Sequence, residues 1–88
     1  MTMHGADPEQ LAQLGRTLRT QIDTIDGVVS VVGGALANTV WHGPARDRFA
    51  REWDESFTMA LMRLKDAFGA AGGECIARAD ELRRVMGV

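Results

Sequence analysis

Trp41-His42-Gly43-Pro44 decides the fold, because it is the one strong helix-breaking signal near the middle of the chain. Gly43 can adopt backbone angles that are closed to other residues. Pro44 has no amide proton and suits the first turn of a helix. It also disfavours the helical conformation in the residue before it. The four residues therefore predict that one helix ends, the chain reverses direction and a second helix begins.

The residues before this turn have the spacing of one long amphipathic helix. Asp7 is expected as its N-cap, Pro8 as its first residue, and Gln10 is placed to complete a capping box. The apolar residues that follow recur every three or four positions, which is the periodicity of a helix and not of a strand. They are Leu11, Leu14, Leu18, Ile22, Ile25, Val29, Val32, Leu36 and Val40. We therefore expect a first helix over about 8–40.

The residues after the turn repeat this spacing, with the large aromatic side chains closest to the turn. Phe49, Trp53 and Phe57 stand four residues apart and are expected along one side of the second helix. The next large apolar members of the series are Leu61, Leu64 and Phe68. The pattern predicts a second helix over about 44–86. Because the turn, 41–43, is short, the two helices should form an antiparallel hairpin.

Paired glycines leave open whether either helix is continuous. Each glycine inside a helix costs about 1 kcal/mol relative to alanine. Gly33-Gly34 and Gly72-Gly73 therefore have two interpretations. Either the helix breaks or kinks there, or the glycines let another helix approach closely and packing offsets their cost. No polar cluster surrounds the first pair, which favours continuity, and the helical pattern resumes after the second.

Length, composition and charge limit the class of protein. The 88 residues are enough for one domain, 1–88, and the apolar and charged contents of 45% and 25% are typical of a globular protein. A net charge of -2 argues against a nucleic-acid partner, which requires a basic surface. The longest mostly apolar run, 28–41, is too short and too polar to cross a bilayer. Residues 1–6 are expected to form a frayed tail without the features of a Sec-type signal peptide.

The sequence contains no constellation of residues suited to catalysis or metal binding. Its two histidines, His4 and His42, fall in the tail and in the turn, and a metal site needs more ligands than these. Carboxylates alternate with arginines, and such pairing lowers carboxylate pKa values instead of raising them toward acid–base catalysis. Cys75, the single cysteine, cannot form a disulfide within the chain. We expect no enzyme activity, no cofactor, no metal and no small-molecule substrate.

Two helices alone leave apolar surface without a partner. Each helix of a hairpin buries only the strip that faces its neighbour, and Val28, Val31 and Ala35 widen the first strip beyond this. Two hairpins face to face would cover the surplus in a four-helix bundle, with helices crossing at about 20°. The residues expected in the core and dimer interface are Leu11, Leu14, Leu18, Ile22, Ile25, Val29, Val32, Leu36, Phe49, Trp53, Phe57, Leu61, Leu64 and Phe68.

The Trp41-x-Gly43 turn between two helices resembles the ESAT-like WXG family, whose members are small helical hairpins exported by type VII secretion systems. In the family's pattern a small residue and then two aromatic residues follow the glycine. Ala45, Phe49 and Trp53 occupy those places here. The resemblance covers nearly the whole chain. It implies a non-enzymatic protein, secreted without a Sec signal, that leaves the cell as a folded dimer through a membrane-anchored ATPase.

One departure from the family bears on the partner. Members that carry the export signal have a Tyr-x-x-x-Asp/Glu motif after the second helix, and this sequence contains no tyrosine. The departure implies a heterodimer in which a second WXG-type protein supplies that motif. Trp41 and Gly43 would then form half of a two-part recognition signal, beside the partner's tail. Two alternatives stay open: a homodimeric WXG protein, and an unrelated intracellular helical adaptor that has the same turn by chance.

Overall fold

The computed structural model describes residues 6–87, and every element within them is helical. The elements are α1 (Pro8–Asn38), α2 (Pro44–Glu52), the π-helical turn η1 (Trp53–Phe57) and α3 (Thr58–Met86). The last three follow one another directly, so they form a single arm opposite α1. The expected tail at 1–5 lies outside the described residues.

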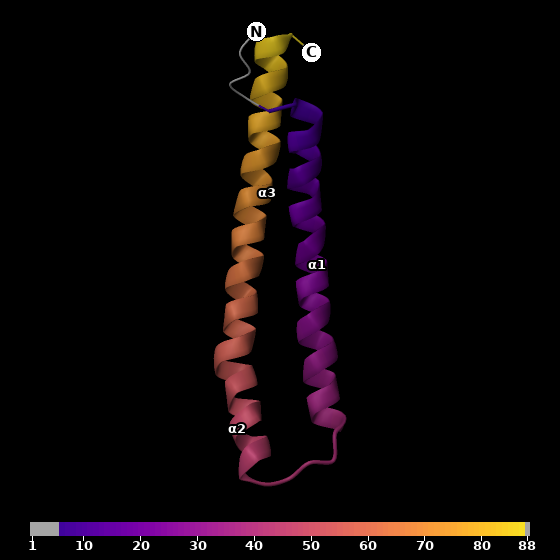
Figure 1. Ribbon diagram of the computed structural model, residues 1–88, viewed down its shortest axis with the longest axis vertical. Coiled ribbons are helices and arrows are strands. Elements are labelled where there is room, and N and C mark those ends of the chain that lie inside the picture. Colours follow the sequence, from indigo (N-terminus) through magenta and orange to yellow (C-terminus); the bar gives the residue numbers. More distant parts are fainter. Residues whose placement is uncertain (1–5, 88) are drawn as a thin grey trace.

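The two arms lie side by side and antiparallel in a rod of 65 × 17 × 17 Å (Figure 1). The start of α1 and the end of α3 share one end of the rod, and the connection between α1 and α2 forms the other end, which we call the tip. The last turn of α3 extends past the start of α1 (Figure 1). The arrangement confirms the expected all-α helical hairpin.

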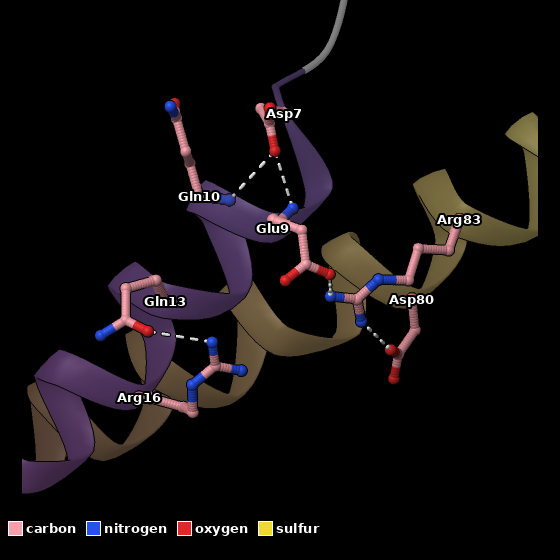
Figure 2. Close-up of polar contacts among 7 residues, drawn as sticks. All are labelled: Asp7, Glu9, Gln10, Gln13, Arg16, Asp80 and Arg83. Carbon is pink, nitrogen blue, oxygen red and sulfur yellow. Dashed lines mark hydrogen bonds and ion pairs between the residues drawn. The ribbon is translucent and has the colours of Figure 1, made fainter. Parts of the chain in front are cut away.

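The start of α1 is set by its own first residues. The carboxylate of Asp7 accepts hydrogen bonds from the backbone amides of Glu9 at 2.8 Å and Gln10 at 3.1 Å (Figure 2). These two amides would otherwise have no partner within the helix. Pro8 follows the cap directly, where its missing amide proton costs nothing. The predicted N-cap Asp7 is confirmed. Gln10 contributes its backbone amide, and among the described residues its side chain does not complete the predicted capping box.

The end of α1 comes two residues earlier than the apolar pattern predicted. The hydroxyl of Thr39 donates to the carbonyl of Ala35 at 2.6 Å, and its backbone is extended. This side chain occupies a carbonyl that a continuing helix would use. The connection therefore covers 39–43 instead of 41–43. Gly43 closes it with a φ of 122°, which side-chain-bearing residues rarely adopt.

Both glycine pairs lie inside continuous helices, so the interpretation that they break the arms is wrong. The irregularity lies instead at η1. There the amide of Thr58 donates to the carbonyl of Trp53, five residues back, and the Thr58 hydroxyl donates to the carbonyl of Asp54 at 2.7 Å. The turn holds one more residue than an α-helical turn would, and the threonine hydroxyl bonds a carbonyl beside the change.

The arms approach each other most closely at two glycines. A methyl group added to Gly15 would lie 2.7 Å from the carbonyl oxygen of Gly72, and one added to Gly72 would lie 2.9 Å from that of Gly15. The fully buried residues nearby are also small: Ala12 and Ala79 are 2% and 0% exposed. Small side chains let the two backbones pack closely over this half of the rod.

Candidate interaction surface

The contact between Gly15 and Gly72 defines a line along which the two arms face each other, which we call the contact line. Each residue of an α-helix turns the side-chain direction by about 100°, so positions can be assigned to one side of this line or the other. The angle of each side chain around its helix axis is measured from the contact line, in the N-to-C direction. Because α1 and α3 are antiparallel, side chains with angles of the same sign lie on the same face of the hairpin. The rod therefore has two distinguishable faces.

One of them, the apolar face, carries apolar residues from both arms. The α1 residues on this side are Leu14, Leu18, Ile25, Val28, Val32 and Leu36, and the α3 residues are Leu64, Phe68, Ala71, Cys75 and Leu82. Several of these side chains remain open to solvent: Leu14 is 49% exposed, and Val28 and Leu64 are each 42% exposed. The apolar face thus presents uncovered apolar surface on both arms.

The opposite face, the ionic face, carries the ion pairs that join the arms. The ammonium of Lys65 on α3 lies 2.7 Å from the carboxylate of Asp26 on α1. At the end of the rod opposite the tip, Arg83 forms ion pairs with Glu9 at 2.6 Å and with Asp80 at 3.3 Å (Figure 2). The hydrogen bond to Asp26 raises the pKa of Lys65 above its usual 10.5. These pairs are partly exposed, so each contributes little to stability, and this face is suited to water.

The tip carries a chain of aromatic rings. The ring centroids of Trp41 and Phe49 are 6.1 Å apart, those of Phe49 and Phe57 are 6.3 Å apart, and those of Phe57 and Trp53 are 6.4 Å apart. Such spacings are within the range of favourable aromatic pairs. Trp53 is 8% exposed, whereas the other three are between 37% and 42% exposed. One ring is therefore inside the hairpin and three lie at its surface.

The π turn explains this division. Counted back from Gly72 along an unbroken α-helix, Trp53 would point about 100° away from the contact line. The extra residue of η1 restores that rotation and points Trp53 at α1, where its indole nitrogen lies 3.7 Å from the position of a Cβ on Gly33. The same rotation moves Phe49 toward the apolar face. The predicted row of three aromatic residues is thus split between the interior and the surface.

The fourteen residues expected in the core and interface differ in burial. Ile25 and Trp53 are buried. The half-buried ones are Leu11, Leu18, Ile22, Val29, Val32, Leu36, Leu61 and Phe68. The exposed ones are Leu14, Phe49, Phe57 and Leu64. Of the two turn residues, Trp41 is 40% exposed at the tip and Gly43 is the N-cap of α2.

Periodicity missed the residues that bring the arms closest. Gly15 and Ala12 were not expected at a helix contact, and for Gly72 close approach of another helix was one of two interpretations left open. The available signal was a glycine next to a leucine in the middle of a strong helical pattern, where a helix gains nothing from glycine. That signal indicates only that another part of the chain approaches the helix closely there, and it does not identify the residue that does so.

The surface area of the chain is large for its mass. It exposes 6379 Å², whereas a compact monomer of this mass exposes about 5,100 Å². The excess, roughly 1,300 Å², is larger than the roughly 800 Å² that one partner buries in a standard protein interface. The elongated rod therefore exposes more surface than a compact monomer of the same mass.

Comparison with protein-family models, curated proteins and solved structures found no match for this chain. Within residues 6–87, no helix combines the length and apolarity that crossing a bilayer requires. In the same part of the chain, no three histidine, cysteine or acidic side chains gather as a set of metal ligands.

Proposed function

We propose that this chain is an ESAT-like WXG protein that a type VII secretion system exports as a folded dimer. In this dimer the apolar face binds a second WXG-type hairpin and the two form a four-helix bundle. The proposal rests chiefly on one observation, the position of the apolar stripe of α1 relative to the contact line.

The stripe of α1 is not centred on its contact with α3. Averaged over the residues from Leu11 to Leu36, its centre lies about 60° to one side of the contact line. A helix with one neighbour needs a stripe centred on that neighbour. In a four-helix bundle each helix packs against two neighbours, and the directions toward them differ by roughly 90°. Its apolar stripe is therefore centred between the two neighbours. This offset fits the second arrangement and supports a further neighbour on the apolar face.

The Trp41-x-Gly43 turn supports the family and the role in export. Trp41 lies half exposed at the tip, where a recognition element is accessible, and Gly43 provides the backbone angle that starts the second arm. Family members with the tail signal carry a tyrosine motif that these 88 residues do not contain. The partner that we propose is therefore a WXG-type protein with that motif, and the dimer is handed to the secretion ATPase.

The test is co-expression with the product of an adjacent reading frame that encodes a Trp-x-Gly hairpin with the tyrosine motif. The mass of the purified complex in solution should equal one copy of each chain. Leu64→Glu, on the apolar face, should abolish the complex, and Met62→Glu, exposed on the opposite face, should leave it intact. A stable homodimer that ignores the neighbour would refute the heterodimer, and a monomeric chain would refute the bundle.

Export is tested separately with Trp41→Ala. The side chain sits at the tip and not on the long apolar face, so the variant should still pair with its partner. Its amount in the culture medium should fall to that of a strain whose secretion ATPase is inactivated. Wild-type protein that stays inside the cell in both strains would favour the intracellular adaptor.

A further inference from the structure

We propose that the π turn η1 divides the aromatic residues between two tasks. Trp53 packs inside the hairpin, while Phe49 and Phe57 form the strongest point of attachment for the second hairpin. We call these two residues the aromatic anchor. The inference rests on the proposed function and names the part of the apolar face that holds the partner most tightly.

The first step is the geometry of η1. An unbroken α-helix would leave Trp53 about 100° from the contact line and would place Phe49 on the outer side of the arm. With one added residue, Trp53 reaches Gly33 on α1 and Phe49 turns to within about 40° of the contact line, on the apolar face. A single insertion therefore moves one ring inward and brings another onto the partner's side.

The second step is the rarity of the turn. A π turn is rare, occurs mostly as a single turn inside an α-helix and is frequent at functional sites. Here the Thr58 hydroxyl bonds the carbonyl of Asp54, which satisfies a group beside the irregular bonds. The packing of Trp53 does not by itself account for the adjacent and partly exposed rings of Phe49 and Phe57. Burial of those rings by a partner explains both the register and the exposure.

The third step is the suitability of the cluster for binding. Few residues carry most of the energy of an interface, and these are enriched in aromatic side chains. The rings of Phe49 and Phe57 already pack against each other with centroids 6.3 Å apart, and Phe49 also packs against Trp41 at 6.1 Å, so little rotamer freedom remains to be lost on binding. The cluster also continues the apolar face, on which Leu64 is the next exposed large apolar side chain. The occupant that fits is therefore the apolar side of a second helical hairpin.

The experiment measures the dissociation constant of the complex with the co-expressed WXG-type partner, by titration of the separated chains. Phe57→Ala should weaken binding by about 30-fold or more, which is the scale of an interface hot spot. Met62→Ala is the matched control, because Met62 is 55% exposed on the opposite face, and binding should change by less than about 3-fold.

Deletion of Ser56, an exposed residue inside η1, tests the register itself. The deletion leaves an α-helical turn, so far-UV circular dichroism should keep its helical signal. Binding should weaken as much as in Phe57→Ala, and Trp53 fluorescence in a Trp41→Phe background should shift to the red as the indole leaves α1. If the deletion variant has no helical signal, Phe49→Ala takes its place in this test, and the same loss of affinity for the partner is expected.

Each result bears on one proposal. Wild-type chains that pair, together with Phe57→Ala that binds as tightly as Met62→Ala, would overturn the aromatic anchor and leave the bundle intact. Wild-type chains that do not pair would overturn the proposed function and the anchor with it.

Discussion

Replacing Gly15 by alanine should destabilise the hairpin, although the same replacement at Gly27 should stabilise it. Both glycines lie inside α1, where alanine is favoured over glycine by about 1 kcal/mol. At Gly15 the new methyl group would lie 2.7 Å from the Gly72 carbonyl oxygen and 2.8 Å from a side-chain carbon of Ile76. Because the first of these atoms belongs to the backbone, the arms must separate.

The magnitude follows from two opposed terms. Overpacking of this kind costs about 1–3 kcal/mol, from which the gain in helix propensity must be subtracted. Gly15→Ala should therefore lose up to about 2 kcal/mol. Nothing lies within 4 Å of a methyl group at Gly27, so Gly27→Ala should gain about 0.5–1 kcal/mol. In a domain of this size, 1 kcal/mol corresponds to about 4–8 °C in Tm.

The assay is thermal unfolding of both variants, followed by circular dichroism. Both are measured at one fixed protein concentration, because the proposed pairing would make Tm depend on concentration. Gly34→Ala serves as a second control, since its site is also open. The reasoning is refuted if Gly15→Ala raises Tm as Gly27→Ala does, because the arms would then have room at their proposed closest approach.

Three further predictions concern single contacts. Asp7→Ala should lower the free energy of unfolding by about 1 kcal/mol through loss of the cap, whereas Asp7→Asn should be nearly neutral, as measured by urea unfolding; equal losses would contradict the cap. The pKa of Lys65 should lie above 10.5 by NMR titration and should fall in Asp26→Asn. The stability contributed by this pair should be present below pH 10.5 and be lost as the pH rises through the folded-state pKa of Lys65. The single-tryptophan variant that retains Trp53 should emit further to the blue and resist acrylamide quenching better than the one that retains Trp41, and identical quenching would contradict their different burial.

The features that the sequence predicted well are those determined by neighbouring residues. Asp7 and Pro8 set the start of α1 through bonds within four residues, and Gly43 with Pro44 sets the start of α2. The end of α1 was misplaced because the apolar pattern continues to Val40. The hydroxyl of Thr39 decides this end, and periodicity does not register such a bond.

The features that it did not predict depend on how one arm is placed against the other. The contact of Gly15 with Gly72 requires a particular register between helices, and a repeat of three and four fits several registers equally. The π turn is hidden for a related reason. Phe49, Trp53 and Phe57 are spaced as on an α-helix, and only Trp53 facing Gly33 on the other arm reveals the extra residue.

The offset of the apolar stripe from the contact line can be determined only from the sequence and the hairpin together. The sequence gives the stripe its width but no reference direction, and the contact of Gly15 with Gly72 supplies that direction. Measured from it, the half-exposed Leu14, Val28 and Leu64 fall on one side. The ion pair of Asp26 with Lys65 falls on the other side, together with the exposed Met62. This arrangement supports the proposed partner on the apolar face. The proposal predicts that charge introduced there disrupts pairing, while the same charge on the ionic face does not.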